Sequence, residues 1–264
     1  MSLSTSLSLV QNPFHRWRSS VDACPDKPLN PSGYALFIRH GHGTHISDDS
    51  SPGFFNGSLD GPKQAVLTKK GIEQAEKAAA LLNTLSVQPL HAVVSPLKRT
   101  VQTFEVFKDK GVRTLDVRIE PSVIEIQAGP HEGEPFNWDL ANDMDNRVPT
   151  KWKGETITSV EKRVLHFVKS TLLPLLEEQN ALIVSHQMIM DTLETFEKDT
   201  KCAVPCEVRV YSKSYLQSWV KKMEKLHFRL ENPPGSKIQP QHVAGVGLIF
   251  SSLSSTPKHA SINS

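Results

Sequence analysis

The sequence predicts an α/β fold in which helices flank a mostly parallel central sheet. Two observations carry this prediction: short apolar runs of strand length recur along the chain, and amphipathic segments of helix length separate them. This alternation is typical of βαβ units, whose strands lie parallel in one sheet and are covered by helices.

The first part of this pattern lies between residues 34 and 119. The apolar run Ala35–Ile38 predicts a buried strand, and Thr68 opens a helix. The inner face of that helix is expected to carry Ile72, Ala75, Ala79 and Leu82. The following elements are a strand over Ala92–Val94, a helix over Leu97–Phe107 and an edge strand over Val117–Ile119.

The second part begins at Thr158, which forms a capping-box signature with Glu161, three residues later. The apolar face of this helix would carry Val160, Val164, Phe167 and Val168. Pro174 is expected to end or kink it, because proline has no N–H for the helical ladder. The apolar run Ala181–Val184 predicts another strand, which leads into a helix through Met188 and Leu193.

The two ends of the chain differ from this pattern. Residues 1–32 contain four prolines and predict a flexible arm. Before Asp22 the arm has arginines and no acidic residue, so an organelle-targeting segment is the alternative. The main domain is expected over residues 33–250, with a basic C-terminal extension from about residue 199 and a flexible tail over 251–264.

The extension over residues 199–264 holds nine Lys and Arg against four Asp and Glu, a net charge of +5. Apolar residues recur in it at helical spacing, at Tyr215, Trp219, Met223, Leu226 and Leu230. The basic residues between them are Lys221, Lys222, Lys225 and Arg229. This pattern predicts a helix that docks on the domain, or alternatively one that contacts an anionic substrate, lipid or partner. A late strand is expected over Val243–Phe250.

Composition excludes several classes of protein. The chain has 264 residues, 38% hydrophobic residues and a formal net charge of +2, which argues against disorder and gives no drive toward nucleic acid. No apolar run is long enough for a transmembrane segment. The cysteines, Cys24, Cys202 and Cys206, are too few for a disulfide scaffold, so we expect a cytoplasmic protein. A metal held by Cys202 and Cys206 with His227 or His242 matches no recognised zinc spacing.

Basic residues follow three of the predicted strands. Arg39-His40-Gly41 follows the first, Ser95 to Arg99 the second, and Ser185-His186 the strand over Ala181–Val184. The carboxyl ends of parallel strands meet at one edge of a sheet, where ligands bind. Buried cations require an anion, and the planar guanidinium fork of arginine suits phosphate oxygens. The sequence therefore predicts a phosphate site.

These residues also resemble the signature of the histidine phosphatase (phosphoglycerate mutase-like) superfamily. After Arg39-His40-Gly41, further matches follow in chain order over roughly residues 33 to 193. They are Leu67, Thr68, Gly71, Gln74 and Ala75; Ser95, Leu97, Arg99, Gln102 and Thr103; Glu125, Gly129, Glu132 and Gly133; Gly154, Glu155, Val160 and Arg163; and Val184, Ser185 and His186. The resemblance implies a three-layer sandwich of the phosphoglycerate mutase type.

The resemblance also implies roles for these residues. His40 would attack phosphorus and become a phosphohistidine, and Glu125 would serve as general acid and then base. His186 would be a third clamp, as an imidazolium beside the phosphate dianion. Arg39, Arg99 and the backbone at Gly41 would bind the phosphoryl group. It implies neither cofactor nor metal. Glu132 is an alternative acid, and Glu155 is expected to order the scaffold.

The sequence departs from the family pattern at two places. Gln187 stands where the family usually has glycine, and no asparagine occupies its usual place shortly after Gly41. The segment from Ser47 to Gly61 is either a mobile lid or a disordered insertion. His42, His45 and His131 are further candidates for substrate contact.

These observations predict a phosphatase that hydrolyses phosphate monoesters of small molecules or phosphoproteins. The alternatives are a phosphoglycerate mutase-type phosphotransferase and a weakly catalytic protein that binds a phosphorylated ligand. Cofactor-dependent mutases have a long insertion between the acid and the Gly-Glu pair. Here Glu125 and Glu155 are only 30 positions apart, which resembles the phosphatases.

Overall fold

The computed structural model describes residues 18–19, 33–47, 52–60, 63–85, 90–197 and 202–233. The strands are β1 (Arg18–Ser19), β2 (Tyr34–Arg39), β3 (Leu90–Val94), β4 (Thr114–Ile119), β5 (Ala181–Ser185) and β6 (Val208–Ser212). The α-helices are α1 (Lys69–Thr84), α2 (Lys98–Asp109), α3 (Trp138–Met144), α4 (Ile157–Phe167), α5 (Leu173–Glu178), α6 (Gln187–Leu193) and α7 (Lys213–Glu231). Short 3-10 helices cover Pro121–Val123 and Gly129–His131, and a π-helix covers Val168–Leu172.

The strands form one sheet in the order β1-β6-β2-β5-β3-β4. All pairs run parallel except β2 and β6, which confirms the predicted α/β fold with a mostly parallel sheet. β4 is an edge strand, as predicted. The sequence analysis missed β6, which lies in the basic extension and pairs with the central strand β2. Within the predicted N-terminal arm, β1 pairs with β6.

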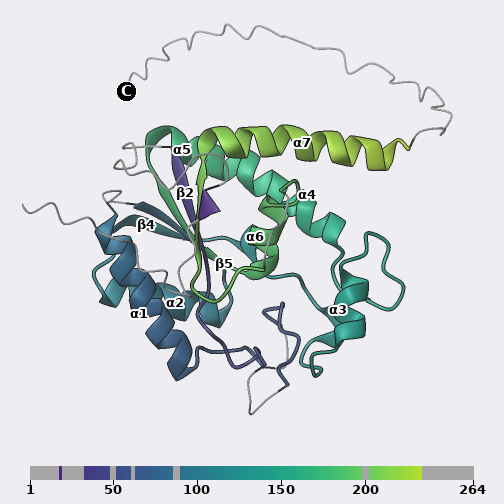
Figure 1. The fold of residues 1–264 in the computed structure, drawn as a ribbon, viewed down its shortest axis with the longest axis horizontal. Helices are drawn as coiled ribbons and strands as arrows, with labels where there is room; N and C mark the ends of the chain where they lie inside the picture. The colour runs from purple at the N-terminus through teal and green to yellow at the C-terminus, as the bar shows by residue number, and fades with distance from the viewer. Residues whose placement is uncertain are drawn as a thin grey trace, which may run out of the picture. The chain divides into compact units, whose positions relative to one another are not determined.

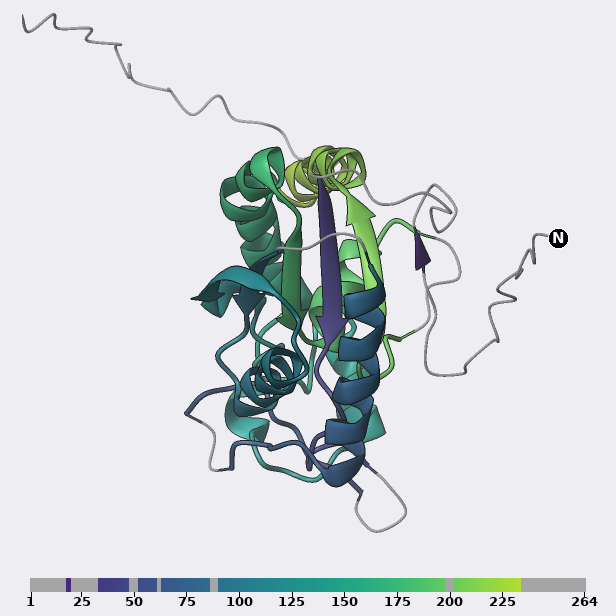
Figure 2. The ribbon, with the colours of Figure 1, turned by 90° about the vertical axis from the view of Figure 1, so that its left-hand side faces the viewer.

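Helices cover both faces of this sheet within residues 1–225, which form one compact unit. α1 and α2 pack on one face, where Leu36 and Ile38 of β2 join alanines of α1 in the larger core cluster (Figures 1 and 2). On the other face, the ring of Phe37 lies 5.5 Å from that of Tyr211, and α4 and α6 cover this side (Figure 1). Three layers result, as the resemblance implied.

Helix α1 begins where the sequence predicts, but its buried face differs in part. Thr68 is the N-cap, and its side-chain oxygen accepts a hydrogen bond from the N–H of Gly71 at 3.2 Å. Ile72 was expected on the inner face and is 43% exposed, so that prediction is wrong. Ala75, Ala79 and Leu82 are buried as predicted, and Gly71 joins them because the helix packs closely against the loop after β2.

The capping box predicted at Thr158 and Glu161 is wrong. Thr156 caps α4 and accepts a hydrogen bond from the N–H of Ser159 at 3.2 Å. The carboxylate of Glu161 is buried and binds both terminal nitrogens of Arg147, at 2.7 and 2.8 Å. The carboxylate of Glu161 therefore pairs with Arg147 and does not cap the helix as the capping-box pattern had predicted.

The predicted disturbance at Pro174 takes the form of a π-helical segment. α4 passes into the π-helix Val168–Leu172, and the chain then resumes as α5 with Pro174 in its first turn. A widened turn next to proline accommodates the missing N–H and the bulk of the ring. The helical path therefore changes pitch and does not end at this residue.

Helix α7 confirms the predicted helix in the extension. Tyr215, Trp219 and Met223 are buried, whereas Leu230 is 44% exposed and does not continue the apolar stripe. The basic side chains of α7 are exposed, at Lys221, Lys222, Lys225 and Arg229. The strand predicted over Val243–Phe250 and the tail over 251–264 lie outside the described residues. Among the helices that the structure describes, none combines the length and apolarity needed to cross a membrane.

Candidate active site

The carboxyl ends of β2, β3 and β5 bring the predicted site residues together. The ladder of the sheet continues beyond the strands, because the N–H of His40 donates to Ser185 O and the N–H of Ser95 donates to Val184 O, each at 3.0 Å. The imidazole of His186, directly after β5, lies with its ring centroid 5.2 Å from that of His40. Arg99, in the first turn of α2, completes this buried group.

The hydrogen bonds of His40 define its tautomer. The Nε of Arg99 can only donate, so His40 Nε2, 3.1 Å away, accepts this bond. The proton is therefore on Nδ1, which donates to the carbonyl oxygen of Gly41 at 2.7 Å. Burial lowers the pKa of His40 well below its usual value, and the positive charge of Arg99 lowers it further. His40 is thus a neutral imidazole whose Nε2 lone pair faces a guanidinium group.

Arg99 is a fully buried cation with neutral hydrogen-bond partners. Its terminal nitrogens donate to the side-chain and main-chain oxygens of Asn56, both at 2.8 Å, and Nη2 lies 3.3 Å from His186 Nδ1. Burial lowers its pKa to about 10, so the group remains charged at neutral pH. A buried guanidinium that contacts an imidazole and amide oxygens retains the capacity to bind an anion.

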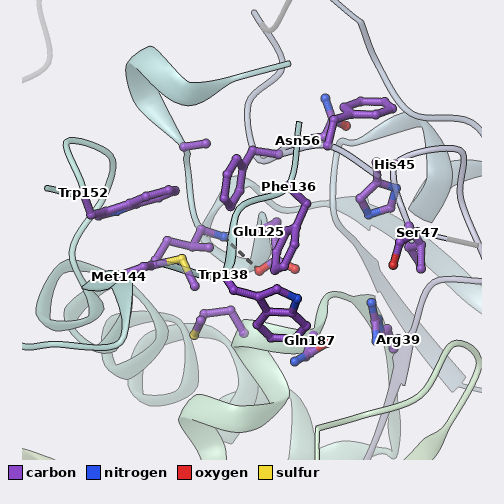
Figure 3. A pocket seen from close by; sticks show the side chains of 16 residues that line it. Arg39, His45, Ser47, Asn56, Glu125, Phe136, Trp138, Met144, Trp152 and Gln187 are labelled. Carbon is purple, nitrogen blue, oxygen red and sulfur yellow. Dashed lines mark hydrogen bonds between the residues drawn. The ribbon is translucent and has the colours of Figure 1, made fainter. Parts of the chain in front are cut away.

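Arg39 ends β2 and provides a second cation. One of its terminal nitrogens donates to Ala203 O at 2.5 Å. Its Nε is buried and has no hydrogen-bond partner in the described part of the chain. Burial lowers the pKa of this guanidinium too. Arg39 lines the cavity described below and is one of the donors available to a bound anion (Figure 3).

The imidazolium expected of His186 beside a phosphate dianion stays a prediction, and the hydrogen bonds in the structure are those of a neutral ring. Its Nδ1 faces a donor, Nη2 of Arg99, so Nε2 carries the proton and donates to Ser95 Oγ at 2.7 Å. Burial lowers the pKa of His186 well below its usual value, and Arg99 adds to this effect. The ring is therefore neutral in the structure, because two cations already lie close to it.

The motif residues around the loop after β2 hold its backbone. The N–H of Gly41 donates to Thr103 Oγ1 at 3.0 Å, and the N–H of His42 donates to Gln74 Oε1 at 2.9 Å. A Cβ atom at Gly71 would lie 2.1 Å from His42 O, so only glycine permits this approach of α1. Thr103, Gln74 and Gly71 thus fix the backbone that carries His40.

Glu125 reaches the cavity from the loop after the first 3-10 helix. Its Oε1 accepts a hydrogen bond from the N–H of Ile126 at 2.9 Å, and its carboxylate faces the cavity (Figure 3). Arg163 binds Glu155 through two hydrogen bonds of 2.8 and 2.9 Å and donates to Glu125 O at 3.2 Å. Glu155 therefore orders the loop of Glu125, in line with the expected scaffold role.

Glu132 has a different environment from Glu125. Its carboxylate accepts hydrogen bonds from the N–H groups of Gly57, at 3.0 and 3.1 Å, and Ala128, at 2.9 Å. These bonds join the loop of Glu132 to the segment after residue 52. The carboxylate is thereby engaged by main-chain donors, and Glu132 does not line the cavity.

The segment predicted as a lid or insertion forms a wall of the site over residues 52–60. Asn56 is buried, and its side chain binds Arg99, Lys63 O and the N–H of Ala65. The sequence analysis did not single out Asn56, because its contact with Arg99 joins residues 43 positions apart. Residues 48–51 and 61–62 of the predicted segment lie outside the described residues.

The three additional histidines separate in the structure. His45 lines the cavity with its ring centroid 5.3 Å from that of His40, and burial lowers its pKa well below the usual value. His42 Nδ1 lies 3.0 Å from Thr68 Oγ1. His131 stacks on Trp152 with ring centroids 5.3 Å apart. Only His45 of these three is therefore placed to contact a substrate in the cavity.

A cavity of about 270 Å³ is lined by His45, whose ring lies 5.3 Å from that of His40, and by Asn56, which binds Arg99. His40, Arg99 and His186 themselves are fully buried behind these residues and do not line it. Its polar lining comprises Arg39, His45, Ser47, Asn56, Glu125 and Gln187 (Figure 3). Its apolar lining includes Phe54, Phe55, Phe136, Trp138, Met144 and Trp152. Gln187, which departs from the family pattern, faces this space without closing it. The described residues contain no group of three His, Cys, Asp or Glu side chains placed to hold a metal ion, including at Cys202 and Cys206.

Comparison with known proteins adds independent findings. Residues 35–195 match the model of the histidine phosphatase superfamily, branch 1. The chain is 29% identical over 141 residues to a 2,3-bisphosphoglycerate-dependent phosphoglycerate mutase of Thermoplasma acidophilum, which covers 52% of this chain and 64% of the relative. It is 30% identical over 166 residues to an adenosylcobalamin/alpha-ribazole phosphatase of Escherichia coli, covering 59% of this chain and 74% of the relative.

A solved structure shares the fold. The product of an open reading frame of Mycobacterium tuberculosis superposes with a TM-score of 0.53 at 20% identity, over 67% of this chain and 90% of that protein.

Proposed function

Because the chain belongs to the histidine phosphatase superfamily, branch 1, we propose that it hydrolyses phosphate monoesters through a phosphohistidine at His40. The observation that carries this proposal is the pairing of His40 Nε2 with Arg99 Nε at 3.1 Å. A neutral imidazole with an available lone pair thus lies beside a buried cation, which supports a nucleophilic role for His40. The negative oxygens of a phosphoryl group would pair with the positive charge of Arg99. Its phosphorus is an electrophile that the lone pair of His40 can attack.

The first step transfers the phosphoryl group to the protein. Its oxygens take the N–H donors of Arg99 and Arg39, which releases the lone pair of His40 Nε2. Nε2 then forms a bond to phosphorus as the ester P–O bond breaks. Glu125 donates its proton to the leaving oxygen, so the alcohol departs neutral.

The second step regenerates the protein. The Glu125 carboxylate takes a proton from water, whose oxygen attacks phosphorus as the P–N bond breaks. Inorganic phosphate leaves, and His40 returns to its neutral state with the proton still on Nδ1. His186 and Asn56 assist by holding the Arg99 guanidinium in place throughout.

The test compares wild type with His40→Ala and Glu125→Gln on p-nitrophenyl phosphate and on an alkyl phosphate. His40→Ala should release phosphate at least about 10³-fold more slowly from both. Glu125→Gln should lose about 10²- to 10⁴-fold on the alkyl ester and less on p-nitrophenyl phosphate, whose leaving group departs without a proton. Acid-labile radiolabel on His40 should appear during turnover.

The exposed His166, replaced by alanine, is the matched control and should keep full activity. Phosphate release by His40→Ala at the wild-type rate would refute the nucleophile. The mutase among the relatives motivates one further arm with 3-phosphoglycerate. Formation of 2-phosphoglycerate without free phosphate would show that the protein transfers the phosphoryl group back to the substrate and does not hydrolyse it.

A further inference from the structure

The cavity has two chemically different sides. Arg39, His45 and Ser47 lie on one side, and Phe136, Trp138 and Met144 lie on the other (Figure 3). The carboxylate of Glu125 lies between the two sides in the same view. In a phosphate monoester, the bridging oxygen likewise lies between a charged phosphoryl group and the rest of the molecule. The cavity therefore has a separate surface for the leaving group.

Four aromatic rings build that surface, which we call the aromatic wall: Phe55, Phe136, Trp138 and Trp152. The ring of Phe55 lies 5.2 Å from that of Phe136 and 5.4 Å from that of Trp152, and Phe136 lies 5.1 Å from Trp138. Phe55 and Trp152 are buried, whereas Phe136 is 37% and Trp138 73% exposed. The buried pair supports the wall, and the exposed pair presents ring surface to the cavity and its mouth.

Beside the aromatic wall, the polar side chains of the cavity lining are Glu125 and Gln187, and Gln187 already hydrogen-bonds Asp191. The side chain of Asn56 already binds Arg99, Lys63 O and the N–H of Ala65. Arg39 and His45 lie on the opposite, phosphoryl side (Figure 3). Sugar hydroxyls placed against the ring faces of Phe136 and Trp138 would gain no hydrogen bond from those faces. A leaving group with an aromatic face gains contact there instead.

Resting on the proposed function, we propose that the substrate is a small aryl phosphate, whose ring packs on Phe136 and Trp138. The cavity volume of about 270 Å³ lies just below the roughly 300–1,000 Å³ of typical small-molecule sites, so it suits one ring system. With the ring on the wall and the phosphoryl group at Arg39, the phenolic oxygen faces Glu125. Trp138 is thus a specificity-determining residue of this site.

Binding tests this proposal independently of turnover. Phenylphosphonate and methylphosphonate carry the same charged group, are not hydrolysed, and differ in the ring. Wild type should bind phenylphosphonate about tenfold more tightly in calorimetry, the effect expected for one aromatic contact with its buried area. Trp138→Ala should abolish that preference, and Trp138→Phe should retain most of it.

The matched control is Phe228→Ala, which removes an exposed aromatic ring that does not line the cavity and should keep the preference. Circular dichroism of each variant confirms that it is folded. Equal binding of the two phosphonates by wild type would overturn the proposal, as would a preference that survives in Trp138→Ala.

Turnover separates this proposal from the proposed function. Wild type should hydrolyse phenyl phosphate with a kcat/KM about tenfold or more above that for glycerol phosphate, and Trp138→Ala should narrow this ratio. A phenylphosphonate preference without any hydrolysis would contradict the proposed function and leave the aryl site supported. Hydrolysis of both esters at equal kcat/KM would support the proposed function and contradict the aryl site. If a phosphotyrosine peptide is hydrolysed better than phenyl phosphate, the proposal that the substrate is a small molecule is overturned.

Discussion

His40 and His186 are imidazoles that the fold keeps neutral beside a cation. Each presents one nitrogen to an N–H of Arg99 and donates from the other, to Gly41 O and Ser95 Oγ respectively. A protonated ring could not accept from Arg99, so protonation would break both the hydrogen bond and the charge balance. The lone pair of His40 Nε2 would therefore be available at neutral pH without a separate base, as the proposed function requires.

This arrangement predicts a pH-dependent stability. The pKa values of His40 and His186 lie below about 6.5 in the folded protein, so below that pH the unfolded chain binds more protons. The free energy of unfolding should then fall with falling pH, by up to about 1.4 kcal/mol per pH unit for each fully buried ring. Urea denaturation between pH 5 and 7.5 measures the slope.

His40→Gln should make the free energy of unfolding depend less steeply on pH, by the contribution of about one proton, because glutamine does not titrate. His166→Gln replaces an exposed histidine on α4 and should keep the wild-type slope. If His40→Gln and wild type lose stability in parallel as the pH falls, His40 is not held neutral by the fold.

At the scale of elements, α1 and the loop after β2 are held together by close backbone approach. Gly71 in the first turn of α1 faces His42 O, and Thr68 both caps the helix and donates to His42 O at 3.2 Å. The N-terminal end of α1 thus sets the position of the loop that carries His40. Side-chain size at Gly71 controls this distance.

Gly71→Ala should therefore destabilise the protein. Alanine normally stabilises a helix interior by about 0.5–1 kcal/mol relative to glycine, but here its Cβ would lie 2.1 Å from a carbonyl oxygen. Relieving that overlap should cost about 1–3 kcal/mol in chemical denaturation. Because the loop moves, kcat should also fall by about 100-fold.

The exposed Glu73 on the same helix provides the control, since Glu73→Ala should change stability by less than about 0.5 kcal/mol. A Gly71→Ala protein as stable and active as wild type would show that α1 can shift without moving the loop.

At the scale of the whole molecule, the site gathers cations from distant parts of the chain. Arg39 ends β2 and Arg99 lies in the first turn of α2, and burial together with the positive charge of Arg39 lowers the pKa of Arg99. Folding therefore concentrates like charge in one buried place. An anion bound there offsets this repulsion and stabilises the folded state over the unfolded one.

Inorganic phosphate should accordingly raise the melting temperature. At 100 times its Kd, phosphate would add about 2.7 kcal/mol, or roughly 2–4 °C for each kcal/mol in a domain of this size. Thermal scans against sodium chloride at equal ionic strength measure this. Arg39→Gln should reduce the shift, whereas Lys98→Gln, at an exposed neighbour of Arg99, should not. Equal shifts with chloride and phosphate would contradict a specific anion site.

The sequence by itself predicted most of the elements and the residue types at three strand ends. The strands containing Ala35–Ile38 and Ala181–Val184, the cap at Thr68 and the basic residues after each strand follow from apolar periodicity and local capping, which neighbouring residues fix. Parallel strands then bring those strand ends to one edge. Much of the fold and the candidate cluster of His40, Arg99 and His186 could thus be predicted from local patterns.

Only the tertiary structure decided what surrounds that cluster. Asn56 beside Arg99, the pairing of Glu161 with Arg147, strand β6 and the aromatic wall all join residues that are far apart or that carry no periodic signal. The neutral state of His186 also depends on burial beside Arg99. The physical reason is that local propensity acts over a few residues, whereas side-chain contacts and desolvation are set by long-range packing.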